Sequence, residues 1–247
     1  MTRWLNNHRI PISNRLLAAL PEEVFQRLAP KLEPVSLAFG KTIYESGDRI
    51  YHVYFLNRNT LASLYITMAD GASAGASVVG HEGIVGIQAF LRAERIPNRV
   101  IVQVAGGAMR MRADELRVEF NRGGLLQDLL LRYTHALFTQ ILQVAACNQL
   151  HSVEERLSRW LLMIHDRVTP DDFPLTQELI SRRLGAHRSS VSEAAGILRR
   201  EGLIRYKRGK LTILDFERLK SFACECYGVI KEEFDRTLGN FSPGHSF

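Results

Sequence analysis

The hydrophobic period of this chain changes once, near residue 112, and that change constrains the fold more than any other sequence feature. From Val35 to Met111, short apolar, β-branched and aromatic runs such as YHVYFL and RVIVQV are separated by turns that contain glycine. Runs at this regular spacing predict an antiparallel β-barrel or β-roll. From Ala113 to about Val168 the apolar residues recur at every third or fourth position, which predicts helices. The chain is therefore expected to be α+β, with sheet and helix in separate segments.

A long helical pattern follows the predicted β-roll and begins at Leu125. Its apolar residues form a stripe on one side of the helix, made of Leu126, Leu130, Tyr133, Leu137, Ile141 and Val144. A single helix of about 25 residues protrudes beyond a small β-domain, so a partner helix is expected. We predict that the stripe forms a dimer interface. The alternative is that it packs only on the β-domain of its own chain.

Positive charge is concentrated near the C-terminus. The formal net charge of the chain is +6, and residues 175–222 hold all of it. A local positive field favours an anionic partner such as nucleic acid.

The stretch LTQELISRRLGAHRSSVSEAAGILRREGLI has the pattern of two short helices. Thr176 is a helix cap, Gly185 can end the first helix in the left-handed conformation, and a second helix is expected from Arg188 to Arg200. The second helix is expected to bury Val191, Ala195 and Leu198. Two short helices joined by a tight turn with glycine predict a helix-turn-helix unit.

Two apolar alternations, LIRY and KLTILD, follow this unit around a basic turn. They predict a β-hairpin wing beside the helices, so that the domain is a winged helix. In such a domain the second helix enters the major groove, and basic wing residues contact phosphate. The residues predicted to contact DNA are Thr176, His187, Arg188, Ser189, Ser190, Ser192, Glu193, Arg199, Arg205, Lys207, Arg208 and Lys210.

Two other classes of function compete with DNA binding. An enzyme would need a catalytic motif, and the sequence has no phosphate loop, nucleophile elbow or HExxH pair. His151, Glu154 and Glu155 are interpreted as helix side chains near a domain junction, and no catalytic residue is predicted. A protein-interaction module with a vestigial helix-turn-helix would bind DNA weakly and without salt dependence.

Three segments together resemble the CRP/FNR superfamily of bacterial transcription regulators. They are Glu45-Ser46-Gly47-Asp48 followed by Tyr54-Phe55-Leu56, the long helix, and the helix-turn-helix stretch. The resemblance runs from about Arg15 to Tyr227. It implies a cyclic-nucleotide-binding-like β-roll, a dimerisation helix and a winged helix-turn-helix domain. The expected domains are residues 1–120 for the N-terminal helices and β-roll, 121–150 for the dimerisation helix, 151–227 for the winged helix and 228–247 for a C-terminal extension.

The resemblance also implies partners. A regulator of this kind binds a palindromic operator in double-stranded DNA as a homodimer, contacts RNA polymerase and can respond to an effector held in the β-roll. The candidate effector pocket contains Gly80, Glu82, Gly83, Asn98 and Arg99. The spacing is wider than in cyclic-nucleotide binders and no hydroxyl residue follows the arginine, which counts against cyclic AMP. A ligand-independent regulator, with its pocket collapsed around Val79, Ile87 and Phe90, is the alternative.

The cysteine pattern identifies no cofactor. All three cysteines, Cys147, Cys224 and Cys226, lie beyond the β-roll, so an N-terminal iron–sulfur cluster of the oxygen-sensing type is not expected. Cys224 and Cys226 are separated by one residue with no neighbouring histidine in the sequence, and no metal site is predicted. A redox-responsive regulator that uses Cys147 remains an alternative. Because the chain has neither a long uncharged apolar run nor a leader pattern, we expect a cytoplasmic protein outside the membrane.

Overall fold

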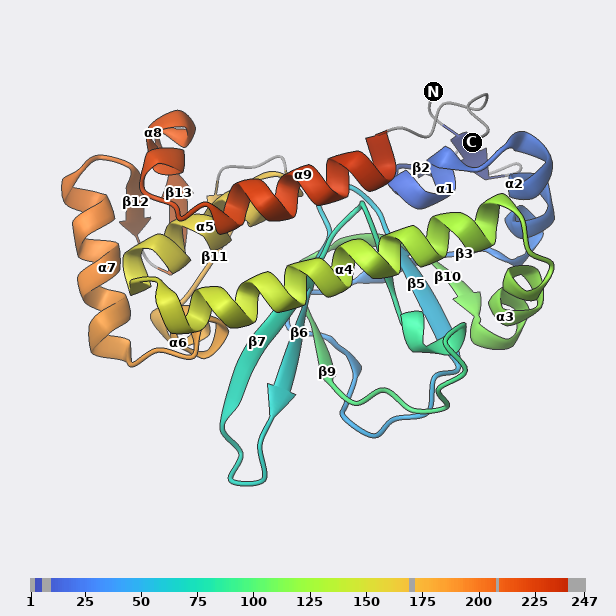
Figure 1. Cartoon of the computed structure of the whole chain (residues 1–247), viewed down its shortest axis with the longest axis horizontal. Coiled ribbons are helices and arrows are strands. Elements are labelled where there is room, and N and C mark those ends of the chain that lie inside the picture. The colour runs from blue at the N-terminus through green and yellow to red at the C-terminus, as the bar shows by residue number, and fades with distance from the viewer. Residues whose placement is uncertain (1–2, 6–9, 169–171, 208, 240–247) are drawn as a thin grey trace.

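The computed structural model describes residues 3–5, 10–168, 172–207 and 209–239. Along its longest axis, the N-terminal helices lie at one end and the helix-turn-helix domain at the other, with the β-roll between them below a long helix (Figure 1). The predicted α+β fold, with a β-roll, a long helix and a helical C-terminal domain, is confirmed.

Two four-stranded antiparallel sheets form the β-roll, with strand orders β3-β10-β5-β8 and β4-β9-β6-β7. The strands are β3 (Glu33–Leu37), β4 (Thr42–Tyr44), β5 (His52–Leu56), β6 (Leu61–Thr67), β7 (Ser73–Val79), β8 (Ile84–Val85), β9 (Arg99–Val104) and β10 (Gly106–Arg112). Alternate side chains such as Leu37, Leu56, Val79 and Val100 point inward and form the core between the sheets.

The N-terminal elements pack on one end of the roll. They are a strand pair, β1 (Arg3–Leu5) and β2 (Ile10–Ile12), two helices, α1 (Arg15–Ala19) and α2 (Glu22–Leu28), and a 3₁₀ turn, η1 (Ala29–Lys31). The buried Asn14 caps α1 by accepting from the backbone N–H of Leu17. Its Nδ2 donates to the carbonyl oxygens of Leu56 and Gly83, each at 2.8 Å. One capping side chain therefore ties α1 to strand β5 and to the loop before β8.

The β-roll leads into two helices, α3 (Ala113–Asn121) and α4 (Leu125–Leu150). Gly123 and Gly124 separate them with φ values of 76° and 73°, a conformation that glycine adopts without steric cost. Gln140 of α4 donates to Ser77 Oγ and, at 3.0 Å, to the carbonyl oxygen of Val78. Buried polar contacts of this kind fix α4 against β7.

The apolar stripe predicted to form a dimer interface is instead buried inside the chain. Leu126, Leu130, Tyr133, Leu137 and Val144 are between 0% and 4% exposed, and Ile141 packs partly against the same core. The β-roll and the C-terminal helix α9 (Cys226–Gly239) cover this side of α4. The prediction that these six residues bind a second copy is therefore wrong, because intramolecular packing already occupies them.

The next helix, α5 (Val153–His165), begins after a short break. His151 is extended, and Ser152 forms a capping box with Glu155, in which each residue's backbone N–H donates to the other's side chain. Leu157, Trp160, Leu161 and Ile164 of α5 are fully buried. The break forms an elbow between α4 and the C-terminal domain.

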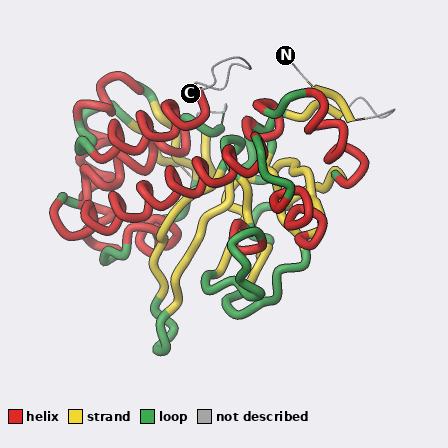
Figure 2. The backbone as a smooth tube through the Cα atoms, turned by 45° about the vertical axis from the view of Figure 1, so that its right-hand side comes forward, coloured by secondary structure: helices red, strands yellow, loops and turns green. Residues whose placement is uncertain are grey.

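In its described residues, the C-terminal domain contains three short strands and four helices besides α5. They are β11 (Asp172–Pro174), α6 (Gln177–Leu184), α7 (Arg188–Arg200), β12 (Ile204–Lys207), β13 (Lys210–Ile213), α8 (Phe216–Ser221) and α9. Figures 1 and 2 show α9 running back beside α4, above the strands of the roll. Phe234 of α9 contacts Tyr133 with 6.2 Å between ring centroids. No helix among these described residues is long and apolar enough to span a membrane.

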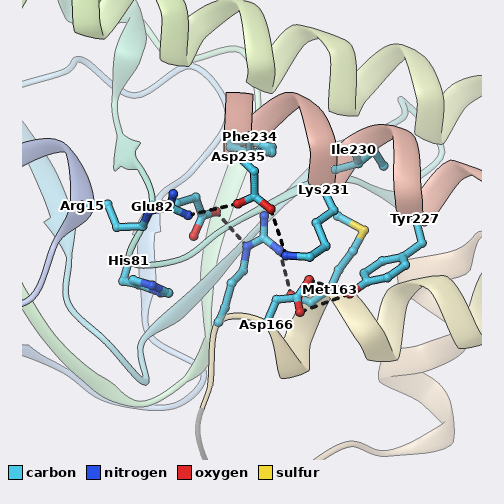
Figure 3. Close-up of a pocket in the computed structure, with 11 residues that line it drawn as sticks. Arg15, His81, Glu82, Met163, Asp166, Tyr227, Ile230, Lys231, Phe234 and Asp235 are labelled. Atoms are coloured by element: carbon cyan, nitrogen blue, oxygen red, sulfur yellow. Dashed lines mark hydrogen bonds and ion pairs between the residues drawn. The ribbon is translucent and has the colours of Figure 1, made fainter. Parts of the chain in front are cut away.

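A buried ion pair joins the β-roll to the C-terminal domain (Figure 3). Glu82, in the loop between β7 and β8, accepts from Arg167 Nε at 2.7 Å, and their side chains are 5% and 7% exposed. Burial alone would raise the pKa of Glu82, but the charges of Arg167 and His81 outweigh it and lower this pKa. The pair lines a cavity of about 120 Å³ together with residues of α9.

A second contact between the domains holds an arginine against the roll. Arg183 of α6 is 3% exposed and lies over Gly75 of β7, where any added Cβ would collide with its guanidinium group. Desolvation lowers the pKa of Arg183 to about 10. This close approach therefore requires a residue without a Cβ atom at position 75. The requirement is steric and does not depend on the backbone conformation of Gly75.

Candidate nucleic-acid interface

Helix α6 begins and ends as its sequence predicts. Thr176 Oγ1 accepts from the backbone N–H of Leu179 at 3.1 Å, which caps the first turn. Gly185 ends the helix at φ 59° and ψ 39°, in the left-handed region. Its backbone N–H donates to the carbonyl oxygen of Ser181. Ser181 Oγ in turn donates to the carbonyl oxygen of Ala186 at 2.6 Å, which fixes the turn before α7.

Helix α7 presents a polar face and buries an apolar one. Val191, Ala194 and Leu198 are fully buried between α7 and the rest of the domain. The predicted core position Ala195 is only partly buried, since the helix is rotated so that Ala194 faces inward. His187, at the N-cap, makes no side-chain capping bond. The first backbone N–H groups of α7 are therefore open to a phosphate.

The structure leaves the predicted contact residues at the surface. Thr176, His187, Arg188, Ser189, Ser192, Glu193 and Arg199 are exposed, and Ser190 is partly buried. Helix-terminal N–H groups, hydroxyls and guanidinium groups are the donors that contact DNA phosphates and bases. The surface has the required chemistry, and the contacts themselves stay a prediction.

The predicted wing is a three-stranded sheet in the order β11-β13-β12. Lys207 faces Lys210 across the β12–β13 pair, and both side chains are exposed, as is Arg205. Arg208 lies outside the described residues. Tyr206 donates to the carbonyl oxygen of Leu175 at 2.7 Å and holds the wing against the start of α6. Basic residues therefore project from a fixed hairpin.

Arg188, the residue predicted to make a bidentate contact with a base, forms an ion pair that the sequence did not reveal. Arg188 Nη2 lies 2.9 Å from Glu178 Oε2 of α6. Arg182 approaches the other oxygen of the same carboxylate at 3.2 Å. Arg182 and Arg188, together with His187, line a groove of about 840 Å³ between the turn of the helix pair and the β6–β7 hairpin. The guanidinium of Arg188 is therefore already paired within the chain, and its contact with a base stays a prediction.

The residues of the predicted effector pocket are divided between two places. Glu82 turns to Arg167 at the domain junction, and Gly80 and Gly83 lie beside it. Arg99 Nε instead lies 3.1 Å from Glu45 Oε2, and Arg99 Nη2 donates to Thr42 Oγ1 at 3.3 Å. Asn98 is 5% exposed, and its Nδ2 has no hydrogen-bond partner among the residues that the structure describes. The structure does not pair Glu82 with Arg99, and an effector at these residues stays a prediction.

One set of described side chains could hold a metal, away from the surface predicted to contact DNA. Cys147, His151, Cys224 and Cys226 place their ligand atoms within 4.8 Å of one another at the elbow after α4. The expectation of no metal site rested on the lack of a histidine near the Cys-x-Cys pair in sequence. The fold brings His151 to that pair from a distant part of the chain.

Residues 155–222 match the family model of the Crp-like helix-turn-helix domain. This range contains α6, α7 and the wing. No curated protein matches the chain in sequence.

Solved structures share the architecture along most of the chain. FixK2 from Bradyrhizobium japonicum is 15% identical, with a TM-score of 0.67 over 78% of this chain and 98% of FixK2. A putative transcriptional regulator of the crp/fnr family from Eubacterium rectale is 17% identical, with a TM-score of 0.65 over 84% of this chain and 96% of that one. TTHB099, a CRP family regulator from Thermus thermophilus, is 21% identical, with a TM-score of 0.63 over 76% of this chain and 96% of that one. At these identities the likeness establishes the fold, and the predicted resemblance is confirmed.

Proposed function

We propose that this chain, whose residues 155–222 are a Crp-like helix-turn-helix domain on the CRP/FNR fold, is a DNA-binding transcription regulator that acts as a homodimer on a palindromic site. The observation that carries the proposal is the surface formed by α7 and the wing. The N-terminal end of α7 exposes Arg188, Ser189 and Ser192, and the wing exposes Lys207 and Lys210 beside it.

The two parts of this surface have different roles. Arg188 is suited to bidentate contact with a guanine in the major groove, which distinguishes one base from another. Lys207 and Lys210 are suited to phosphates, which every sequence presents equally. The first role gives sequence preference, and the second gives affinity that depends on salt.

A second apolar face of α4 supports the homodimer. Leu131, Phe138 and Leu142 are 45%, 57% and 54% exposed, on the side of α4 opposite the buried stripe. Their spacing of seven and four residues is that of a helix seam. Pairing of this face with the same face of a second copy would bury it and bring two copies of α7 onto one duplex.

The β-roll is placed to influence DNA binding. It touches the helix-turn-helix domain through the Glu82–Arg167 pair and through Arg183, which belongs to α6. A signal that shifts the roll would therefore move the helix before the recognition helix. Such a shift would change how the two α7 helices of the dimer are placed relative to each other. A signal would therefore act as an effector only if it bound one of these placements more tightly than the other.

The test is selection of bound duplexes from a random library by the purified protein, at two salt concentrations. We expect a palindrome with half-sites about one helical turn apart, and retention that falls steeply with salt. In the Arg188→Ala variant the base preference at one position of each half-site should relax, with a loss of about 10- to 150-fold on the selected site.

Matched variants separate the two parts of the surface. Lys207→Ala should weaken all duplexes about equally and lower the salt slope by about one per chain. Arg122→Ala removes the same charge beside α3, at the opposite end of the molecule, and should leave binding unchanged. If Arg188→Ala and Lys207→Ala both bound the selected site like the parent, the interface would be elsewhere.

A further inference from the structure

Three cysteines and one histidine meet at the elbow between α4 and α5. Cys147 Sγ lies 3.5 Å from Cys224 Sγ, and Cys226 Sγ lies 3.6 Å from His151 Nδ1. All four ligand atoms lie within 4.8 Å of one another. The three thiols are at most 6% exposed. Cys147 lies in the last turn of α4 and His151 follows that helix, while Cys224 lies in the loop before α9 and Cys226 is the first residue of α9.

A second layer of side chains supports these four. Glu225 Oε2 lies 3.4 Å from His151 Nε2, so that the carboxylate orients the ring with Nδ1 toward the thiols. Gln143 Nε2 donates to Cys226 Sγ at 3.2 Å. A carboxylate behind a histidine is the usual outer partner of a metal ligand. The four residues are therefore held by outer side chains in the way that metal ligands are held, and they are more than a group of buried thiols.

The environment also favours a negative charge on sulfur. The positive charge of Arg159 acts on Cys147. Arg159 is 2% exposed, and its Nε has no hydrogen-bond partner in the described structure. A buried cation without a full set of partners stabilises an anionic centre beside it.

We propose that Cys147, His151, Cys224 and Cys226 bind one zinc ion as a closed tetrahedral site. Zinc–sulfur bonds of 2.3 Å place two ligand sulfurs of a tetrahedron about 3.8 Å apart, close to the 3.5 Å between Cys147 Sγ and Cys224 Sγ. Iron–sulfur clusters fit less well, because their four ligands are divided among two or four iron atoms, and ligands of different irons are held farther apart by the irons and sulfides between them. On binding, the three thiols release up to three protons, and the three thiolates and a neutral imidazole then hold the ion.

The ion would fix the geometry of the elbow. Only His151 and Ser152 lie between α4 and α5, and α5 leads into the helix-turn-helix domain. Zinc would fasten this break to the start of α9, which itself packs along α4. Resting on the proposed function, this implies that zinc sets the position of α7 relative to the dimer helix and so its affinity for the operator.

The first experiment measures metal in the full-length protein, produced with zinc in the medium and dialysed. We expect about one zinc per chain by elemental analysis, and three thiols that react with a thiol reagent only after a chelator is added. Cobalt(II) added to the chelated protein should give the intense visible bands of a tetrahedral site and thiolate-to-cobalt charge-transfer absorption.

Two histidine variants and one outer-layer variant locate the site. His151→Gln should bind zinc with at least about tenfold weaker affinity and lose the tetrahedral cobalt spectrum. His135→Gln, the same change at an exposed position of α4, should bind like the parent. Glu225→Gln should keep the tetrahedral spectrum, with a zinc affinity about 10- to 100-fold weaker. Because Glu225 is not itself a ligand, this variant tests the site without changing a buried ligand.

Three results would overturn the proposal. They are a folded protein whose three thiols react freely and hold no zinc, a disulfide between Cys147 and Cys224 in protein isolated without metal, and iron with sulfide in place of zinc.

The consequence for DNA is tested separately, with the operator found by selection. Chelation should lower operator affinity about tenfold or more and zinc should restore it, while His135→Gln behaves like the parent. Zinc binding without any effect on DNA would leave the site standing and overturn only its role at the elbow. A zinc-loaded protein that binds no DNA would instead contradict the proposed function.

Discussion

At the scale of single residues, Glu178 pairs with Arg188, the arginine that we propose gives sequence preference. Its carboxylate pairs with Arg188 at 2.9 Å, and both side chains are more than half exposed. An exposed pair of this kind contributes little to stability, about 0.2 to 1 kcal/mol. The pair therefore holds Arg188 in place without preventing its transfer to a base.

Glu178→Gln should strengthen operator binding by about two- to fivefold, because Arg188 no longer has to leave a carboxylate and one negative charge is removed near the phosphates. The measurement is a titration of the selected duplex at fixed salt. Glu217→Gln, the same change on α8 where Glu217 pairs with Lys220, is the control and should bind like the parent. Weaker binding by Glu178→Gln would mean that Glu178 positions Arg188 for DNA instead of competing with it.

At the scale of elements, α4 has two apolar faces with different uses. The stripe through Leu130 and Tyr133 supports the β-roll and α9, and the face with Leu131, Phe138 and Leu142 remains exposed. Both faces follow the helical period, so the period alone does not distinguish them. What distinguishes them is which side the rest of the chain covers.

Phe138→Asp should convert the dimer to a folded monomer, because it places a charge in the seam between two copies of α4. Light scattering coupled to size-exclusion chromatography measures the mass, and circular dichroism checks the fold. Phe39→Asp makes the same change at a β-roll side chain of similar exposure, 53% against 57%, and should remain dimeric. A dimer that survives Phe138→Asp would place the interface on another surface.

At the scale of the whole molecule, the buried Glu82–Arg167 pair couples the β-roll to the C-terminal domain. Glu82→Gln leaves Arg167 buried without its counter-charge, and such a loss costs about 3 to 5 kcal/mol of unfolding free energy. Urea denaturation at neutral pH measures it. Glu33→Gln, which removes the partner of the more exposed Arg110, should cost less than about 1 kcal/mol.

The effect of Glu82 should depend on pH in a defined direction. The fold holds the pKa of Glu82 below its usual value, despite a burial contribution that raises it. The carboxylate therefore stabilises the protein above its unfolded pKa of about 4.3, and this contribution is lost as pH falls through the folded pKa. The stability gap between parent and Glu82→Gln should shrink below about pH 4. A gap that stays constant would show that loss of packing, and not of charge, causes the destabilisation.

Local sequence patterns were sufficient to predict the elements and the chemical character of the surface proposed to contact DNA. Caps such as Thr176 and Gly185, and the period of Val191 and Leu198, act over a few residues and are encoded where they lie. Clustering of charge near α7 and the wing was equally visible. This local information indicated a CRP/FNR-like chain before any contact was known.

Only the tertiary structure decided which distant groups meet. It covered the apolar stripe of α4, turned Glu82 toward Arg167 and brought Glu178 to Arg188. It also gathered the proposed zinc ligands, for which the close spacing of Cys224 and Cys226 in the sequence was the only local sign. Each of these contacts joins residues whose proximity depends on how helices and sheets pack, and periodicity along the chain carries no information about that packing.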